Sequence, residues 1–296
     1  MAKGNVTTDA IRQWVGGRLR NVDRLVSQRD AGMFDADDAQ ILLCAAVAAM
    51  AADHWPRNGD PKDSDHARFV QFLIEYGSSD SVVTFISIPY LLRLVSKNSK
   101  FIKECDILTR RTLYVPQPAG GVATGRVGTG PGALSNDMDA DADVVEAWLA
   151  ENRPLTEELR KTVRKASYAS IIYRDLRCGL VHEHRRGEAL GRWSVTIRSG
   201  PHYVLAFDGD GTPGWRLCLP YEYVRKVVEG VLLRACDWLD GSPHFVRDGE
   251  ATRPHPGSWW IDPGPLANDS RGASAGTGIK LYGRPLWPTV SRAGLV

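Results

Sequence analysis

Apolar residues recur at steps of three and four along several segments of the chain, which is the spacing of one helix face. The first such segment starts at Thr8, and the second runs from Asp37 to about His54. The second is apolar on nearly all sides, so we expect it at the centre of a helical bundle. The same spacing predicts two further helices, over residues 65–76 and 82–97, the latter interrupted by Pro89. The N-terminal third is therefore predicted to be all-α.

Helical spacing returns near Ala142 and again at Thr156, which is placed to cap a long helix leading into the most basic part of the chain. After Gly191 the spacing changes to alternation of apolar and polar residues. This alternation predicts a three-stranded antiparallel meander, with strands at residues 193–197, 203–207 and 215–219. Pro220 then fits the first turn of a closing amphipathic helix. The expected fold is mainly α, a helical bundle with a small inserted sheet.

The order of these segments divides the chain into four regions. They are an N-terminal helical region 1–112, a linker 113–141, a region of motif helices with the inserted meander 142–241, and an irregular Pro/Gly-rich tail 242–296. The linker is rich in Pro and Gly and carries an Asp at every second position from Asp137 to Asp143. That composition is typical of an exposed loop.

Composition favours an ordinary soluble protein of 296 residues, with 37 Lys+Arg against 35 Asp+Glu. The longest uninterrupted apolar run, Ile41–Ala52, is well short of the roughly 20 residues that span a bilayer. The first residues contain no apolar core of a signal peptide, so a cytoplasmic protein without a membrane segment is expected. The five cysteines are widely spread, and His54, His66 and His202 stand singly, so no metal or other cofactor is predicted.

Basic charge is concentrated in one segment. Between Arg160 and Arg198 there are ten Lys/Arg and three Asp/Glu, and within it the fourteen residues Tyr173–Arg186 hold four Arg, two His and two acids. Arg offers a permanently charged planar fork to a phosphodiester, and His exchanges a proton near neutral pH. Together they suit cleavage of a phosphate ester through an internal 2′-hydroxyl, which RNA has and DNA lacks.

The stretch from Arg177 to His182, RCGLVH, resembles the signature of the HEPN superfamily, an Arg followed after four to six residues by a His. The resemblance implies a helical bundle and, in many members, a metal-independent endoribonuclease in which two copies of the motif face each other across a homodimer. It makes Arg177 and His182 the catalytic pair, and the similar helical context extends over Thr156–Leu239. Arg174 lies at helical spacing from His182 and is expected to assist.

Other basic residues near the motif are predicted to contact RNA phosphates from the solvent side: Lys165, His184, Arg185 and Arg186. Five positions on a straight helix correspond to a rotation of about 500°, which leaves Arg177 and His182 about 140° apart. A twofold homodimer would bring an Arg of one chain to a His of the other. An antitoxin or a defence-complex protein is a further expected partner of such an enzyme.

Two other interpretations stay open. Active HEPN members often carry Asn or Asp directly after the motif Arg, whereas this chain has Cys178. That difference favours a non-catalytic HEPN-like module that binds nucleic acid or a partner. Basic residues near the C-terminal end of a helix also interact favourably with the helix dipole, so the cluster can have a purely structural role. The second open interpretation is accordingly a structural subunit that packs against another protein.

Overall fold

The computed structural model describes residues 3–27, 36–55, 64–78, 82–111, 133–151, 154–183, 185–191, 200–207 and 213–241. All of them belong to the first of two compact units, residues 1–262, and the second unit, residues 263–296, lies outside the described residues. The predicted tail 242–296 therefore lies outside them as well. The described part is mainly helical, as the apolar spacing predicts. None of its helices combines the length and apolar character needed to cross a membrane.

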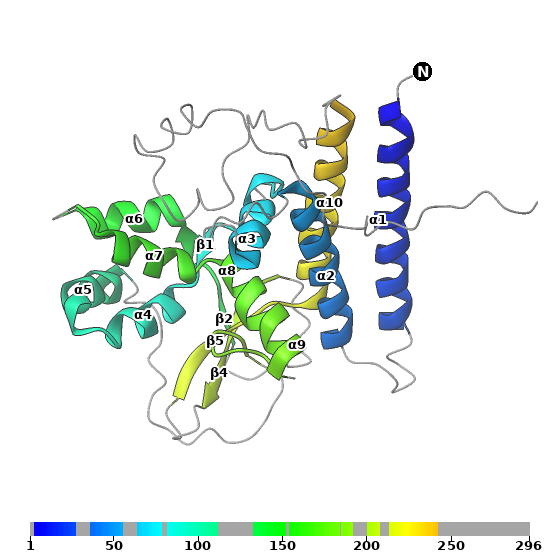
Figure 1. Cartoon of the computed structure of the whole chain (residues 1–296). Coiled ribbons are helices and arrows are strands. Elements are labelled where there is room, and N and C mark those ends of the chain that lie inside the picture. The colour runs from blue at the N-terminus through cyan, green and yellow to red at the C-terminus, as the bar shows by residue number, and fades with distance from the viewer. Residues whose placement is uncertain are drawn as a thin grey trace, which may run out of the picture. The chain divides into compact units, whose positions relative to one another are not determined.

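Three long helices pack against one another: α1 (Lys3–Ser27), α2 (Ala36–His54) and α10 (Tyr221–Gly241) (Figure 1). The helix α3 (Asp65–Glu75) packs on α2. The apolar face of α1 that the spacing predicts is buried at Ile11, Val15, Leu19 and Val22. Burying such a side chain stabilises the fold by about 1.5–3 kcal/mol. Because α2 contacts α1, α3 and α10, its predicted central position is confirmed.

A second helical group consists of α4 (Ile88–Ser96), α5 (Ile102–Arg111), α6 (Ala142–Ala150) and α7 (Glu157–Lys165), with the short 3₁₀ turn η3 (Ser99–Phe101) between α4 and α5. Within this group α4 packs on α5 and α7, and α6 packs on α5 and α7. Residues from both sides of the predicted linker thus share one packed core.

The prediction of one helix over 82–97 is wrong at its N-terminal end. Residues Phe85–Ile86 form the short strand β1, and Pro89 lies in the first turn of α4 instead of interrupting a helix. The reason is that N–H groups in the first turn of a helix have no intrahelical acceptor, so a proline there loses no hydrogen bond.

The three-stranded antiparallel sheet has the order β2–β4–β5, in which β4 (His202–Phe207) pairs with β5 (Pro213–Cys218). This hairpin confirms the second and third predicted strands. The other neighbour of β4 is β2 (Ala133–Ser135), which comes from the predicted linker. The predicted first strand, 193–197, lies outside the described residues.

The long motif helix predicted from Thr156 is divided in two. Thr156 caps α7 as expected, because its side chain accepts the N–H of Leu159, but α7 ends at Lys165. The N–H of Ser87 donates to the carbonyl of Ala166, and the side chain of Ser167 caps the next helix. That helix consists of three successive pieces: α8 (Tyr168–Ile171), the π-helical η4 (Ile172–Cys178) and α9 (Gly179–Glu183).

Asp139, in the predicted exposed linker, is buried. Its side chain accepts hydrogen bonds from the hydroxyls of Tyr168 (2.5 Å) and Tyr203 (2.6 Å) and from the N–H of Ile88 (3.0 Å). The expectation of an exposed loop is therefore wrong for Asp139, because this carboxylate joins the start of α4, α8 and β4. The neighbouring strand β3 (Ala140–Asp141) pairs with β1.

We expect Asp139 to make stability depend on pH. The pKa of Asp139 is raised from 3.8 to about 7, because the effect of desolvation exceeds the opposite effect of its three hydrogen bonds. A raised pKa means that the folded state binds the proton more tightly than the unfolded state. The contribution of Asp139 to the free energy of unfolding is therefore complete below about pH 4 and declines as the pH rises to about 7. Denaturant unfolding of the wild type and Asp139→Asn between pH 4 and 7 isolates this contribution, because groups such as His66 titrate in both proteins. The difference between the two free energies of unfolding should decline by about 2–4 kcal/mol over this range. An equal pH dependence in both proteins would contradict the assignment.

Candidate functional site

The predicted motif lies in the π-helical segment and the short α-helix after it. In a π-helix an N–H bonds to the carbonyl five residues earlier, and such segments are frequent at functional sites. At the end of η4, the N–H of Gly179 donates to the carbonyl of Arg174 in this way. Arg174 and Arg177 therefore belong to the π segment, and His182 belongs to α9.

The continuous pieces α8, η4 and α9 together form the motif helix. Residues 185–191 fold back along it. The N–H of Gly187 donates to the carbonyl of Asp175 (2.8 Å), and the N–H of Arg185 donates to that of Gly179 (3.2 Å). A Cβ on Gly179 would lie 2.6 Å from the carbonyl oxygen of Arg185, and one on Gly187 would lie 2.2 Å from a carboxylate oxygen of Asp175. Both glycines are thus required by the close approach of loop and helix.

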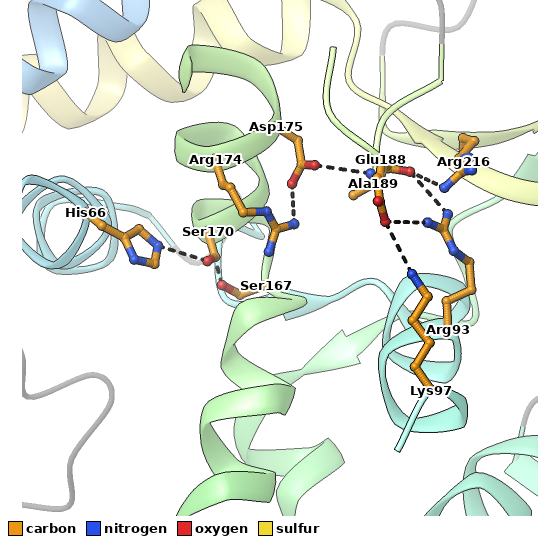
Figure 2. Close-up of polar contacts among 10 residues, drawn as sticks. All are labelled: His66, Arg93, Lys97, Ser167, Ser170, Arg174, Asp175, Glu188, Ala189 and Arg216. Carbon is orange, nitrogen blue, oxygen red and sulfur yellow. Dashed lines mark hydrogen bonds and ion pairs between the residues drawn. The ribbon is translucent and has the colours of Figure 1, made fainter. Parts of the chain in front are cut away.

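The buried carboxylate of Asp175 connects Arg174 to this loop (Figure 2). Its Oδ2 accepts from Nη2 of Arg174, and its Oδ1 accepts from the N–H of Ala189 (3.2 Å). Desolvation raises the pKa of Asp175, while the charge of Arg174 opposes the rise. The guanidinium of Arg174 also lies 5.0 Å from the centre of the Tyr90 ring. Among the described residues, Nε and Nη1 of Arg174 have no hydrogen-bond partner.

The loop is held at its outer side by Glu188. Its carbonyl accepts from Arg93 (3.1 Å) and Arg216, and its carboxylate pairs with Arg93 (3.4 Å) and Lys97 (3.5 Å) (Figure 2). These three basic residues thus hold Glu188 in place.

Arg177 and His182 do not meet within one chain. The guanidinium of Arg177 lies 5.1 Å from the centre of the Tyr173 ring, and its Nη1 donates to Sγ of Cys178 (3.6 Å). His182 is exposed on α9, beside the exposed Val181. No hydrogen bond, ion pair or ring contact joins His182 to another residue in the described part of the chain.

Most basic side chains of this segment have an acidic partner. The pairs are Arg160 and Arg164 with Glu146, Lys161 with Glu157, Arg174 with Asp175, Arg185 with Glu183, and Arg186 with Asp37. In the described residues Lys165 and Arg177 have no acidic partner. Among the described residues of this segment, the basic side chains that no carboxylate pairs with are therefore these two.

The four predicted phosphate contacts have different surroundings. Lys165 is exposed at the end of α7, and Arg185 is exposed beside Glu183. The prediction for Arg186 as a solvent-facing contact is wrong, because its side chain is only 6% exposed and it bonds to Asp37 and to Gln40 (3.0 Å). These bonds join the motif loop to α2. His184 lies outside the described residues.

His66, for which the sequence predicts no functional role, lies against the motif helix. Its Nε2 lies 3.1 Å from Oγ of Ser170, and its ring centre lies 4.9 Å from that of Tyr173. Burial, together with the charges of Arg174 and Lys165, lowers the pKa of His66 to about 4. His66 is consequently neutral at physiological pH.

One sequence signal does point to His66. It precedes the buried Phe69, Val70 and Leu73 at steps of three, four and seven, so it occupies the apolar face of α3. A histidine on such a face is in contact with another element, but the spacing does not say which one.

A comparison with models of known protein families, with curated protein sequences and with solved structures finds no match to this chain. The HEPN resemblance therefore stays a prediction. In the described residues, no three His, Cys, Asp or Glu side chains lie together in a group that could hold a metal ion.

The different surroundings of Arg185 and Arg186 predict different effects on stability. Arg186→Ala leaves Asp37 and Gln40 without their shared partner and should lower the free energy of unfolding by about 2–3 kcal/mol. Arg185→Ala removes an exposed ion pair and should change it by less than about 0.5 kcal/mol. Urea denaturation of the two variants and the wild type measures both values. Similar losses in both variants would contradict the structural role of Arg186.

Proposed function

We propose that the protein is a metal-independent endoribonuclease of the HEPN type. The observation that carries the proposal is the state of Arg177, a cation without an acidic partner in the described residues, on the same short segment as the exposed His182. The thiol of Cys178 is a weak acceptor and leaves the charge of Arg177 intact. A guanidinium of this kind attracts a phosphate strongly because no carboxylate in the described part of the chain competes for it.

In the proposed reaction the 2′-oxygen of RNA attacks the adjacent phosphorus, and the bond from phosphorus to the 5′-oxygen breaks. His182 acts as acid/base, taking the proton from the 2′-hydroxyl or giving one to the leaving 5′-oxygen. Arg177, aided by Arg174, stabilises the negative charge that develops on the phosphate oxygens. The products are a 2′,3′-cyclic phosphate and a 5′-hydroxyl, and the reaction requires no metal.

The proposal includes a homodimer in which Arg177 of one chain and His182 of the other flank one phosphate. The exposed positions of His182 and Val181 on α9 support a contact between copies at this helix. A cytoplasmic role in a toxin–antitoxin or antiviral defence system, with an antitoxin or defence-complex protein as a further partner, is part of the same proposal.

One observation favours the alternative, a HEPN-like module that binds RNA or a protein without cutting. Within one chain, no contact in the described residues joins Arg177 to His182. If copies do not pair, the two side chains stay apart and the chain binds a phosphate without cleaving it.

Incubation of the purified protein with total RNA in EDTA tests the proposal. We expect cleavage by the wild type and a loss of at least about 100-fold in rate in His182→Ala, the scale of general acid–base catalysis. Arg177→Ala should lose a comparable factor, because it removes charge stabilisation of the transition state. The ends of the fragments are identified by their reactivity toward phosphatase and kinase.

The control is Arg110→Ala, which removes the same charge from an exposed position on α5. It should cleave at the wild-type rate. Thermal unfolding checks that every variant is folded. Equal cleavage by all four proteins would refute the catalytic assignment, and RNA binding without any products would favour the binding module. Sedimentation with and without RNA tests the dimer, since a monomer that cleaves would contradict a shared site.

A further inference from the structure

A cleft with a volume of about 310 Å³ opens between α1 and α2, which lie side by side in Figure 1. The described residues that line it all belong to these two helices, so the cleft is separate from the motif helix. Packed helices normally leave few spaces larger than one water molecule between them. This cleft has the volume of about ten water molecules, which places it in the size range of small-ligand sites.

Small and apolar side chains form the wall that α2 contributes. Ala45, Ala46 and Ala49 line the cleft, and their short side chains leave the space that larger residues would fill. Leu42 lines it as well and is 38% exposed. The wall therefore presents apolar surface to water, and an apolar ligand that covers this surface gains free energy.

The wall from α1 combines apolar and polar side chains on one helix face. Trp14, Arg18, Asn21 and Leu25 follow one another at steps of four, three and four residues, and all four line the cleft. The guanidinium carbon of Arg18 lies 5.4 Å from the centre of the Trp14 ring. This cation–π contact holds the charge of Arg18 at the wall of the cleft.

Two cations of this wall lack a carboxylate. Arg18 and Arg24 both line the cleft, and neither has an acidic partner in the described residues. Elsewhere on α1 an arginine is paired, since Arg12 bonds to Asp237 (2.7 Å). No Asp or Glu is among the described residues that line the cleft. The cleft thus has a positive potential beside an apolar wall, which favours an anion with an apolar part.

We propose that the cleft between α1 and α2 binds a small organic acid, in which one carboxylate is attached to an apolar body of about ten carbon atoms. The guanidinium of Arg18 pairs with the carboxylate, because its planar fork matches the two oxygens. Asn21 offers an amide N–H to the same group. The apolar body lies against Leu42 and Ala45. Aromatic and alkyl acids share this chemistry, and the experiment distinguishes them.

The size of the cleft favours a small molecule over a protein partner. Ten described residues line the cleft. A stable protein interface takes about 20–30 residues on each side. An acidic helix from another protein would therefore need further surface outside the cleft, whereas a small acid is covered by the cleft itself.

Isothermal titration calorimetry of the full chain at pH 7 with three compounds tests the proposal. The compounds are 2-naphthoate, decanoate and the uncharged 2-naphthalenemethanol. At least one acid should bind the wild type about tenfold more tightly than the alcohol. Arg18→Gln should weaken binding of that acid about tenfold and leave the alcohol unchanged, because it removes a charged hydrogen-bond donor. Arg20→Gln is the matched control, since Arg20 is exposed on α1 and does not line the cleft.

Ala45→Leu tests the position of the site. Ala45 is exposed on α2, so a leucine there extends into the cleft without disturbing the buried contacts. Binding of the acid should fall at least about tenfold, because the side chain occupies the space of the apolar body. Ala150→Leu, at an exposed position at the end of α6, is the control and should bind as the wild type does. Thermal unfolding checks that each variant is folded.

Each outcome decides for or against the acid site. Tighter binding of 2-naphthoate supports an aromatic ligand, and tighter binding of decanoate supports an alkyl ligand. Absence of binding by the wild type overturns the proposal, as does an acid that binds Arg18→Gln or Ala45→Leu as it binds the wild type. Equal affinities for acid and alcohol also overturn it and favour a protein helix as the occupant. If Ala45→Leu fails to fold, Arg18→Gln decides, because Arg18 is exposed. None of these outcomes depends on RNA cleavage.

Discussion

The buried carboxylate of Asp175 holds the motif helix and the loop after it in one arrangement. It fixes Arg174 by an ion pair and fixes the loop by accepting the N–H of Ala189. The backbone carbonyl of Asp175 accepts the N–H of Gly187. A carboxylate at this depth is costly unless it is paired, and Arg174 offsets that cost. The direction of Arg174 and the path of residues 185–191 therefore depend on the same side chain.

Ion pairing decides which basic side chains of the segment can meet a ligand. The sequence concentrates ten Lys/Arg between residues 160 and 198, but charge alone does not distinguish a free cation from a paired one. In the described residues, carboxylates from α2, α6, α7, η4 and α9 pair with most of them. Lys165 and Arg177 are the exceptions. The guanidinium of Arg177 lies over the Tyr173 ring, and burial together with the charges of Arg174 and Lys165 lowers the pKa of His66. The proposed RNA contacts follow from this difference.

Long-range contacts also explain where the predicted linker becomes structured. Asp139 lies in a stretch whose alternating aspartates are typical of an exposed loop, yet Tyr168, Tyr203 and Ile88 supply three donors to it. The same stretch supplies β2, which pairs with β4. Both features require partners far away in the chain, so local composition could not reveal them.

Local apolar spacing by itself determined the main helices and the hairpin of β4 and β5, and the Arg177–His182 motif was located from its residue types and their spacing. These are set within a few residues, by the burial of one face and by turn-forming residues. The tertiary structure alone decided the break at Ala166, the burial of Arg186 and the approach of His66 to the motif helix. Each depends on a contact between elements far apart in sequence: Ser87 with Ala166, Asp37 with Arg186, and His66 with Ser170. Periodicity identifies the side of a helix that is buried, and only packing determines which residues lie against it.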